Sequence, residues 1–194
     1  MSLNPQEKPT SNIPIPDAGV VPMRLARVIE IGVHDTFYGE KDQVILFYSL
    51  PTRIIEEEGD YNGKQHMIRT APLRKSSSDK ATLMEHINVL NPMAQNLGSD
   101  ILDRPCFGTI IHNEVESGGS TRTFANIQSV SGVPEGMTVG ALDTTPVYFD
   151  FDAPDEDIWN DVLWDGMREQ IKGAKNYPGS AVEAMVLKLA AMQG

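Results

Sequence analysis

Two apolar segments of strand length, separated by one polar turn, constrain the fold of this chain more than any other feature. Residues 23–33 read MRLARVIEIGV and residues 43–51 read QVILFYSLP, and both are rich in β-branched or aromatic residues. The turn between them reads HDTFYGEKD, and Pro51 ends the second segment. Gly32 predicts a bulge or bend near the end of the first segment. We therefore expect two consecutive strands here.

The rest of the chain predicts three further strands of the main sheet, one short additional strand and several helices. The sequence GDYNG (59–63) carries two turn signals between TRIIEEE and KQHMIRTAPL, which indicates a hairpin. Apolar residues at helical spacing lie between Ser78 and Asn91-Pro92, so a helix is expected there, with Ser78 as its N-terminal cap. A second hairpin is expected over residues 106–130 with Gly118 and Gly119 at its tip. A short strand at 147–151, an acidic helix and an amphipathic stretch at 180–192 follow.

Three strands, a helix and two more strands are the element order of the OB-fold, a small Greek-key barrel. We therefore expect a mainly β protein with accessory helices. It would be a five-stranded OB-fold barrel with a helix between strands 3 and 4 and a C-terminal helical extension. Other five-stranded barrels and α+β sheets also fit this order. The expected organisation is an extended proline-rich arm (1–22), the OB-fold core (23–150) and an acidic helical extension (151–194).

The chain carries 16 Lys and Arg against 27 Asp and Glu, a formal charge of −11, which argues against a surface covered in phosphate-binding groups. The charges are unevenly distributed. The segment from Tyr61 to Ser78 contains four cations and no acid, whereas eight acids lie between Asp143 and Asp165. Both segments are also compatible with ordinary solvated surface.

Several classes of protein and site are not expected. The single cysteine, Cys106, cannot form an internal disulfide or a multi-cysteine zinc site, and a buried structural role is expected for it. The four histidines are scattered, and no Gly-rich phosphate loop precedes a helix. We therefore expect no enzyme and no cofactor. No apolar run reaches the roughly 18 residues of a membrane span, and no secretory signal is recognisable.

Residues 104–137, RPCFGTIIHNEVESGGSTRTFANIQSVSGVPEGM, resemble the end of the core in a family of bacteriophage proteins similar to single-stranded DNA-binding proteins. The matching pieces are Arg104-Pro105-Cys106, His112-Asn113-Glu114, Phe124-Ala125-Asn126-Ile127 and Pro134-Glu135-Gly136-Met137. The similarity extends over roughly residues 20–172. It implies an OB-fold and non-enzymatic, sequence-tolerant binding of single-stranded DNA in phage replication or recombination. A reducing cytoplasm is the expected compartment, which is that of the host cell if the chain is encoded by a phage.

Sequence-tolerant binding of single-stranded DNA needs cations for the phosphates and exposed aromatic faces for the bases. The middle strands and flanking loops form the ligand face of an OB barrel. The candidate DNA-binding residues in these places are Tyr38, Lys41, Arg53, Tyr61, Lys64, Arg69, Arg74 and Lys75. In contrast, Phe47, Phe107 and Phe124 lie in apolar strands and are expected in the core.

Two other functions remain open from the sequence. One is an OB-like protein-interaction module whose acidic C-terminal segment docks a basic partner. Residues 150–165, which include Trp159 and Trp164, could serve this role, recruit replication or recombination proteins, or mimic nucleic acid and compete for the basic groove. The other is a metal-dependent nuclease that uses carboxylate pairs such as Asp150 and Asp152.

Overall fold

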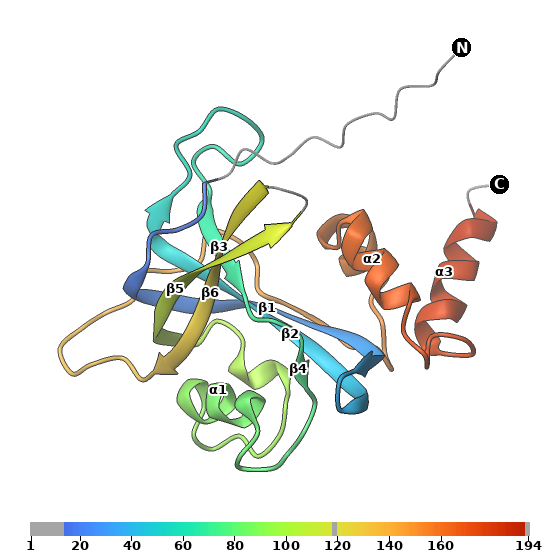
Figure 1. The fold of residues 1–194 in the computed structure, drawn as a ribbon. Helices are drawn as coiled ribbons and strands as arrows, with labels where there is room; N and C mark the ends of the chain where they lie inside the picture. Colours follow the sequence, from blue (N-terminus) through green and yellow to red (C-terminus); the bar gives the residue numbers. More distant parts are fainter. Residues whose placement is uncertain (1–13, 118–119, 193–194) are drawn as a thin grey trace.

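The computed structural model describes residues 14–117 and 120–192. An antiparallel sheet in the order β3-β2-β1-β5-β6 curls until β3 approaches β6, which gives a nearly closed, barrel-like sheet (Figure 1). Its strands are β1 (Gly19–Thr36), β2 (Gly39–Ile54), β3 (Gln65–Arg69), β5 (Pro105–Ser117) and β6 (Ser120–Ser131). Two short strands extend it: β4 (Leu73–Arg74) pairs antiparallel with β2, and β7 (Val147–Phe149) pairs parallel with β1. The prediction of a mainly β protein is confirmed.

The hairpin of β1 and β2 is the longest element of the sheet. Its register slips between Leu25 and Arg27 and again between Glu30 and Gly32, which confirms the bulge expected at the glycine. Gly32 has a φ of +80°, and a Cβ there would lie 2.7 Å from Ala174 Cβ. The strand begins earlier than expected, because residues 19–22 pair with β5 instead of belonging to an arm. Gly118 and Gly119, the expected tip of the second hairpin, lie outside the described residues.

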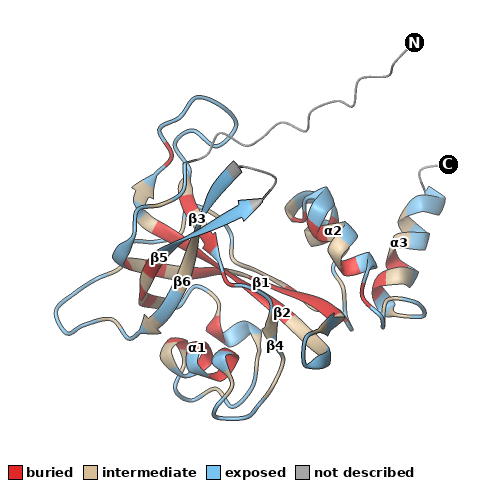
Figure 2. Ribbon diagram, viewed as in Figure 1, coloured by how far each residue is buried: buried red, intermediate tan, exposed pale blue. Residues whose placement is uncertain are grey.

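The inner core fills the barrel and is closed by helix α1 (Thr82–Leu90) (Figure 2). The helix begins after Ala81 rather than next to Ser78, which therefore does not cap it as expected. A 3₁₀ turn, η1 (Ser99–Ile101), connects the helix to β5. The core contains Val21, Met23, Leu25, Val28, Val44, Leu46, Tyr48, Leu50, Ile68, Leu83, Met84, Ile87, Leu90, Ile101, Cys106 and Ile110. The predicted burial of Cys106 is confirmed.

A second core lies on the outer face of β1 and β2, beneath the C-terminal segment. After β7 the chain forms a π-helical turn, η2 (Ile158–Val162), and helices α2 (Asp165–Lys172) and α3 (Ala181–Met192), which lie beside the barrel in Figure 1. Strands β1 and β2 contribute Ile29, Ile31, Ile45 and Phe47, and β7 contributes Phe149. The C-terminal segment after β7 contributes Phe151, Trp159, Leu163, Met167, Ile171, Ala174, Val182 and Met185. Burying each large apolar side chain contributes about 1.5–3 kcal/mol. Apolar packing therefore holds this segment against the barrel.

The aromatic residues expected in the core have mixed outcomes. Phe47 is buried as predicted, and Phe107 is half-buried. The prediction of a core position for Phe124 is wrong, because about half of its surface is exposed on β6. Within residues 14–117 and 120–192, no helix combines the length and apolarity needed to cross a membrane.

Candidate functional site

A groove of about 550 Å³ lies on the outer face of β1, β2 and β3. Its floor contains a row of three side chains from neighbouring strands: Arg27 is paired with Phe47, and Phe47 with Arg69. Paired residues of an antiparallel ladder share one face of the sheet. Because adjacent strands lie about 4.8 Å apart, the two arginines arise from positions roughly 10 Å apart, on either side of the phenyl ring.

Arg27 reaches the groove because of the first bulge in β1. Residues two apart in a regular strand point to the same face. Leu25 points into the inner core, so an unbroken strand would carry Arg27 inward as well. The slip between Leu25 and Arg27 turns the arginine to the outer face. A position that reads as interior in the sequence thus places a guanidinium in the groove.

The cations of the groove are Arg27, Lys64 and Arg69, and its acids are Asp60 and Asp143. Among the described residues, none of the three cationic side chains makes a hydrogen bond or ion pair. Burial lowers the pKa of the half-buried Arg27. Asp143 is already engaged, because its Oδ2 accepts a hydrogen bond from the Gln65 backbone N–H at 2.6 Å. The groove therefore has a net positive lining in a chain of charge −11.

Two exposed aromatic side chains border this groove. Tyr61 is 56% exposed and lies in the loop between β2 and β3. Hydrogen bonds within that loop hold its ends together, from Gly63 N–H to the Ile55 carbonyl at 2.8 Å and from Ile55 N–H to the Lys64 carbonyl at 2.9 Å. The second aromatic, Trp164, comes from the C-terminal segment and meets Phe47 edge to face at 5.7 Å between ring centroids.

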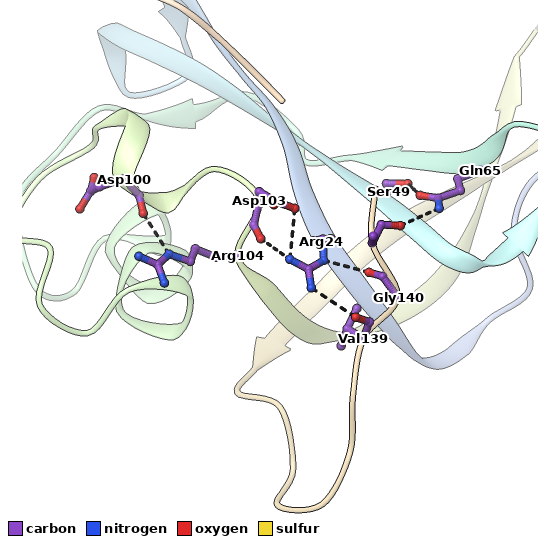
Figure 3. A network of polar contacts seen from close by, with 9 residues as sticks. Arg24, Ser49, Gln65, Asp100, Asp103, Arg104, Val139 and Gly140 are labelled. Carbon is purple, nitrogen blue, oxygen red and sulfur yellow. Dashed lines mark hydrogen bonds and ion pairs between the residues drawn. The ribbon is translucent and has the colours of Figure 1, made fainter. Parts of the chain in front are cut away.

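Residues 139–144 run along the outer face next to the groove, where Asp143 and Thr144 belong to the lining. Figure 3 shows Val139 and Gly140 of this segment beside Arg24 of β1. The Arg24 guanidinium donates to the carbonyls of Gly140 at 2.9 Å and Val139 at 3.2 Å, and also pairs with Asp103. Gln65 Nε2 donates to the Ala141 carbonyl at 2.8 Å. The second core covers the outer face in the other direction along β1 and β2. The groove is therefore the part of the face left open between two covered regions.

The structure brings three of the eight predicted DNA-binding residues together in this groove: Tyr61, Lys64 and Arg69. Lys75 is placed elsewhere, with Nζ 2.8 Å from Glu30 Oε2 and 3.5 Å from Asp42 Oδ2. Burial acts to lower the pKa of Lys75, but the hydrogen bond and charge of Glu30 outweigh it, so the pKa is raised. Lys75 therefore has a structural partner, which the sequence does not reveal because Glu30 lies 45 residues earlier.

The other four predicted residues also lie outside the groove. Arg53 pairs with Asp17 at 2.8 Å. Tyr38 lies at the turn of the first hairpin, where it is 82% exposed and its ring contacts that of Phe37 edge to face. The remaining two occupy strand positions nearer this turn, Lys41 opposite His34 and Arg74 opposite Gln43.

Sequence reasoning missed Arg27 and Trp164 as groove residues. Arg27 depends on a bulge, and Trp164 depends on the packing of a segment more than ninety residues away from β3 in the chain, so no local pattern identifies either. No group of three potential metal-ligating side chains occurs among the residues that the structure describes.

A scan against protein-family models gives no match for the chain, and a search of curated proteins finds no relative. The resemblance to phage single-stranded DNA-binding proteins therefore stays a prediction.

Proposed function

We propose that the chain binds single-stranded DNA in this groove without sequence preference, as a non-enzymatic protein of phage DNA replication or recombination in the host cytoplasm. The observation that carries the proposal is the convergence of Arg27, Lys64 and Arg69, all without an ion-pair partner among the described residues, on a groove bordered by exposed aromatic rings.

The chemistry of the groove fits an extended nucleic-acid strand. Cations along a groove neutralise phosphates and release counterions, which gives salt-sensitive affinity for any sequence. Every base presents a π-face, so stacking on Tyr61 is equally tolerant of sequence. Among the described residues two acids line the groove, and one of them, Asp143, already accepts a hydrogen bond from the Gln65 backbone. The groove therefore offers charge and stacking together.

The architecture supports an OB-fold. We infer that β3 and β4 together act as the third strand, that β5 and β6 are the fourth and fifth, and that α1 is the helix between strands three and four. In this assignment the first strand lies between the second and fourth strands, as β1 lies between β2 and β5. OB-folds bind oligonucleotides over strands two and three, and the groove has its floor on β2 and β3 as well as β1.

A protein-interaction module remains the second candidate, because several carboxylates between residues 150 and 165 are exposed. Part of this acidity has a structural use, since Asp155 Oδ1 accepts from the N–H groups of Asp157 and Ile158 at 2.9 Å. Asp152 and Asp161 remain exposed and available to a basic partner.

The test is a fluorescence anisotropy titration of the full chain with labelled oligo-dT at several salt concentrations. We expect affinity that falls with salt, and Arg69→Ala should weaken it and flatten the slope of log K against log salt by roughly 0.7. The matched control is Arg74→Ala, which removes the same charge from an exposed position on the neighbouring strand β4 and should leave the slope unchanged. No binding at low salt contradicts the proposal and favours the interaction module.

A further inference from the structure

We propose that Trp164 stacks on a base of the bound strand and gives the groove its preference for single-stranded over duplex DNA. This inference rests on the proposed function. It follows from the wall of the groove that the turn between η2 and α2 supplies, since this turn belongs to the C-terminal segment and not to the barrel.

The backbone of Trp164 is firmly held. The residue occupies the N-cap position of α2 in an extended conformation, with φ −79° and ψ 163°. Its carbonyl accepts hydrogen bonds from the N–H groups of Met167 at 2.9 Å and Arg168 at 3.0 Å. Leu163 and Met167 on either side are buried in the second core. Two further bonds from the Arg168 guanidinium, to the carbonyls of Trp159 and Asn160, fix the preceding turn.

The indole itself is positioned but not buried. Its ring lies edge to face against Phe47 with an interplanar angle of 84°, and Phe47 belongs to the row between the two groove arginines. A Cβ on Gly166 would lie 3.3 Å from the indole Nε1, so the glycine leaves room for the ring. Even so, 47% of Trp164 remains exposed. A large aromatic side chain held in place and left half open at a cationic groove has the properties of a base-stacking platform.

Stacking on Trp164 requires an unstacked base, and this supplies the selectivity. In a duplex the bases are already stacked on one another and paired, so they cannot reach a side chain at the wall of a groove without unpairing. Phosphate contacts from Arg27, Lys64 and Arg69 would attract either form of DNA. The indole therefore distinguishes single-stranded from duplex DNA, whereas the cations do not.

The same geometry argues against the hypothesis that the acidic C-terminal segment competes with DNA for the groove. The segment packs on the outer face of β1 and β2 and contributes a wall to the groove, so it forms part of the binding site.

The chain contains only two tryptophans, which makes the test direct. Trp159 is 5% exposed and packs against Phe149 in the second core, away from the groove lining. In Trp159→Phe the only indole is Trp164, and saturating oligo-dT should quench its fluorescence. In Trp164→Phe the only indole is Trp159, and the same oligonucleotide should leave its fluorescence unchanged. Anisotropy of a labelled oligonucleotide confirms saturation in each case.

The affinity of substituted chains provides the second readout. Trp164→Ala should weaken oligo-dT binding about 5-fold to 150-fold, the range spanned by one stacked base, while Trp164→Phe keeps an aromatic face and most of the affinity. Unlabelled duplex and unlabelled single strand are then compared as competitors for the labelled oligonucleotide. The affinity for duplex relative to that for single strand should be higher in Trp164→Ala than in the unaltered chain. Thermal unfolding confirms that each variant is folded.

Three outcomes overturn the inference. Binding of oligo-dT by folded Trp159→Phe with unquenched fluorescence rejects Trp164 as the stacking residue and leaves the proposed function intact. Unchanged single-strand preference in folded Trp164→Ala rejects it as the source of selectivity. Absence of binding by the unaltered chain at low salt overturns the proposed function and this inference with it.

Discussion

Arg27 and Arg69 lie on the same face of the sheet, each paired across the ladder with Phe47, and neither has a carboxylate partner among the described residues. Arginine in a folded protein usually gains a partner when it loses water, because an unpaired buried charge is costly. Arg27 is half-buried without one, and its lowered pKa reflects that loss of water. A charge kept under these conditions is available to a ligand anion.

Arg27→Met should therefore weaken DNA binding without weakening the fold. The apolar side chain removes a partly desolvated charge, so the free energy of unfolding in urea should be unchanged or higher, while the salt slope of oligo-dT binding flattens by roughly 0.7. Arg24→Met on the same strand is the matched control. Its guanidinium bonds to Gly140, Val139 and Asp103, so its loss should lower stability by about 1.5–3 kcal/mol. Equal stability losses in the two variants would contradict this assignment.

The two predicted tyrosines should behave differently, although both are exposed. Tyr61 lines the groove, whereas Tyr38 lies at the turn of the first hairpin, and the second core covers the outer face of β1 and β2 between these places. Tyr61→Ala should cost about 1–3 kcal/mol of oligo-dT binding with an unchanged salt slope, because stacking releases no counterions. Tyr38→Ala should bind as the unaltered chain does. A comparable loss in both variants, measured by anisotropy, would mean that the bound strand extends to the hairpin turn.

The sequence predicts the arrangement of strands better than it predicts the groove. Gly32 and the GDYNG turn act locally, so the bulge in β1 and the turn before β3 are predictable from nearby residues. The strand end predicted at Pro51 is wrong, because β2 continues to Ile54 and its pairing with β3 slips between Leu50 and Ile54. Tyr61, Lys64 and Arg69 share one hairpin, and local reasoning places them together as well. Arg27 and Trp164 depend on a register slip and on packing across the chain, which leave no local pattern.

The acid-free stretch after Tyr61 illustrates the same limit. Its four cations look equivalent in the sequence, but the fold separates them: Lys64 and Arg69 line the groove, Arg74 pairs with β2 nearer the hairpin turn, and Lys75 meets Glu30. Lys75 lies in an acid-free stretch of the sequence, but the fold packs this residue, which follows β4, against Glu30 of β1.

Lys75 should therefore matter for stability and not for DNA binding. Glu30 is buried and also accepts a hydrogen bond from the Tyr148 hydroxyl at 2.6 Å. Lys75→Met leaves this carboxylate without its counter-charge and should lower the free energy of unfolding by roughly 3 kcal/mol in urea denaturation. Adding Glu30→Gln to Lys75→Met should recover part of that loss, because the buried charge is gone. A flattened salt slope in Lys75→Met under conditions where it is folded would instead identify Lys75 as a phosphate contact.

The stability of the chain should fall between pH 7 and pH 5 because of a buried histidine in the inner core. His86 Nδ1 lies 2.7 Å from the Tyr48 hydroxyl, and burial lowers the pKa of His86 to about 4. Burial raises the pKa of Tyr48, so its hydroxyl keeps the proton and donates it to the neutral ring. In the unfolded chain the histidine pKa is about 6.5. Below that pH the unfolded state takes up a proton that the folded state does not, which favours unfolding.

The expected loss from His86 is about 2 kcal/mol between pH 7 and pH 5, growing to about 3 kcal/mol near pH 4, where the folded state also becomes protonated. The pKa of His66 is lowered as well, chiefly by burial, and acts in the same direction. The measurement is urea denaturation across this pH range. The control is the pair of substitutions His86→Leu with Tyr48→Phe, which removes both members of the hydrogen bond so that no buried polar group loses its partner. That variant should show a stability curve flatter by about 2 kcal/mol between pH 7 and pH 5. If its curve matches that of the unaltered chain, His86 is not neutral in the folded protein, and the acid sensitivity has another source.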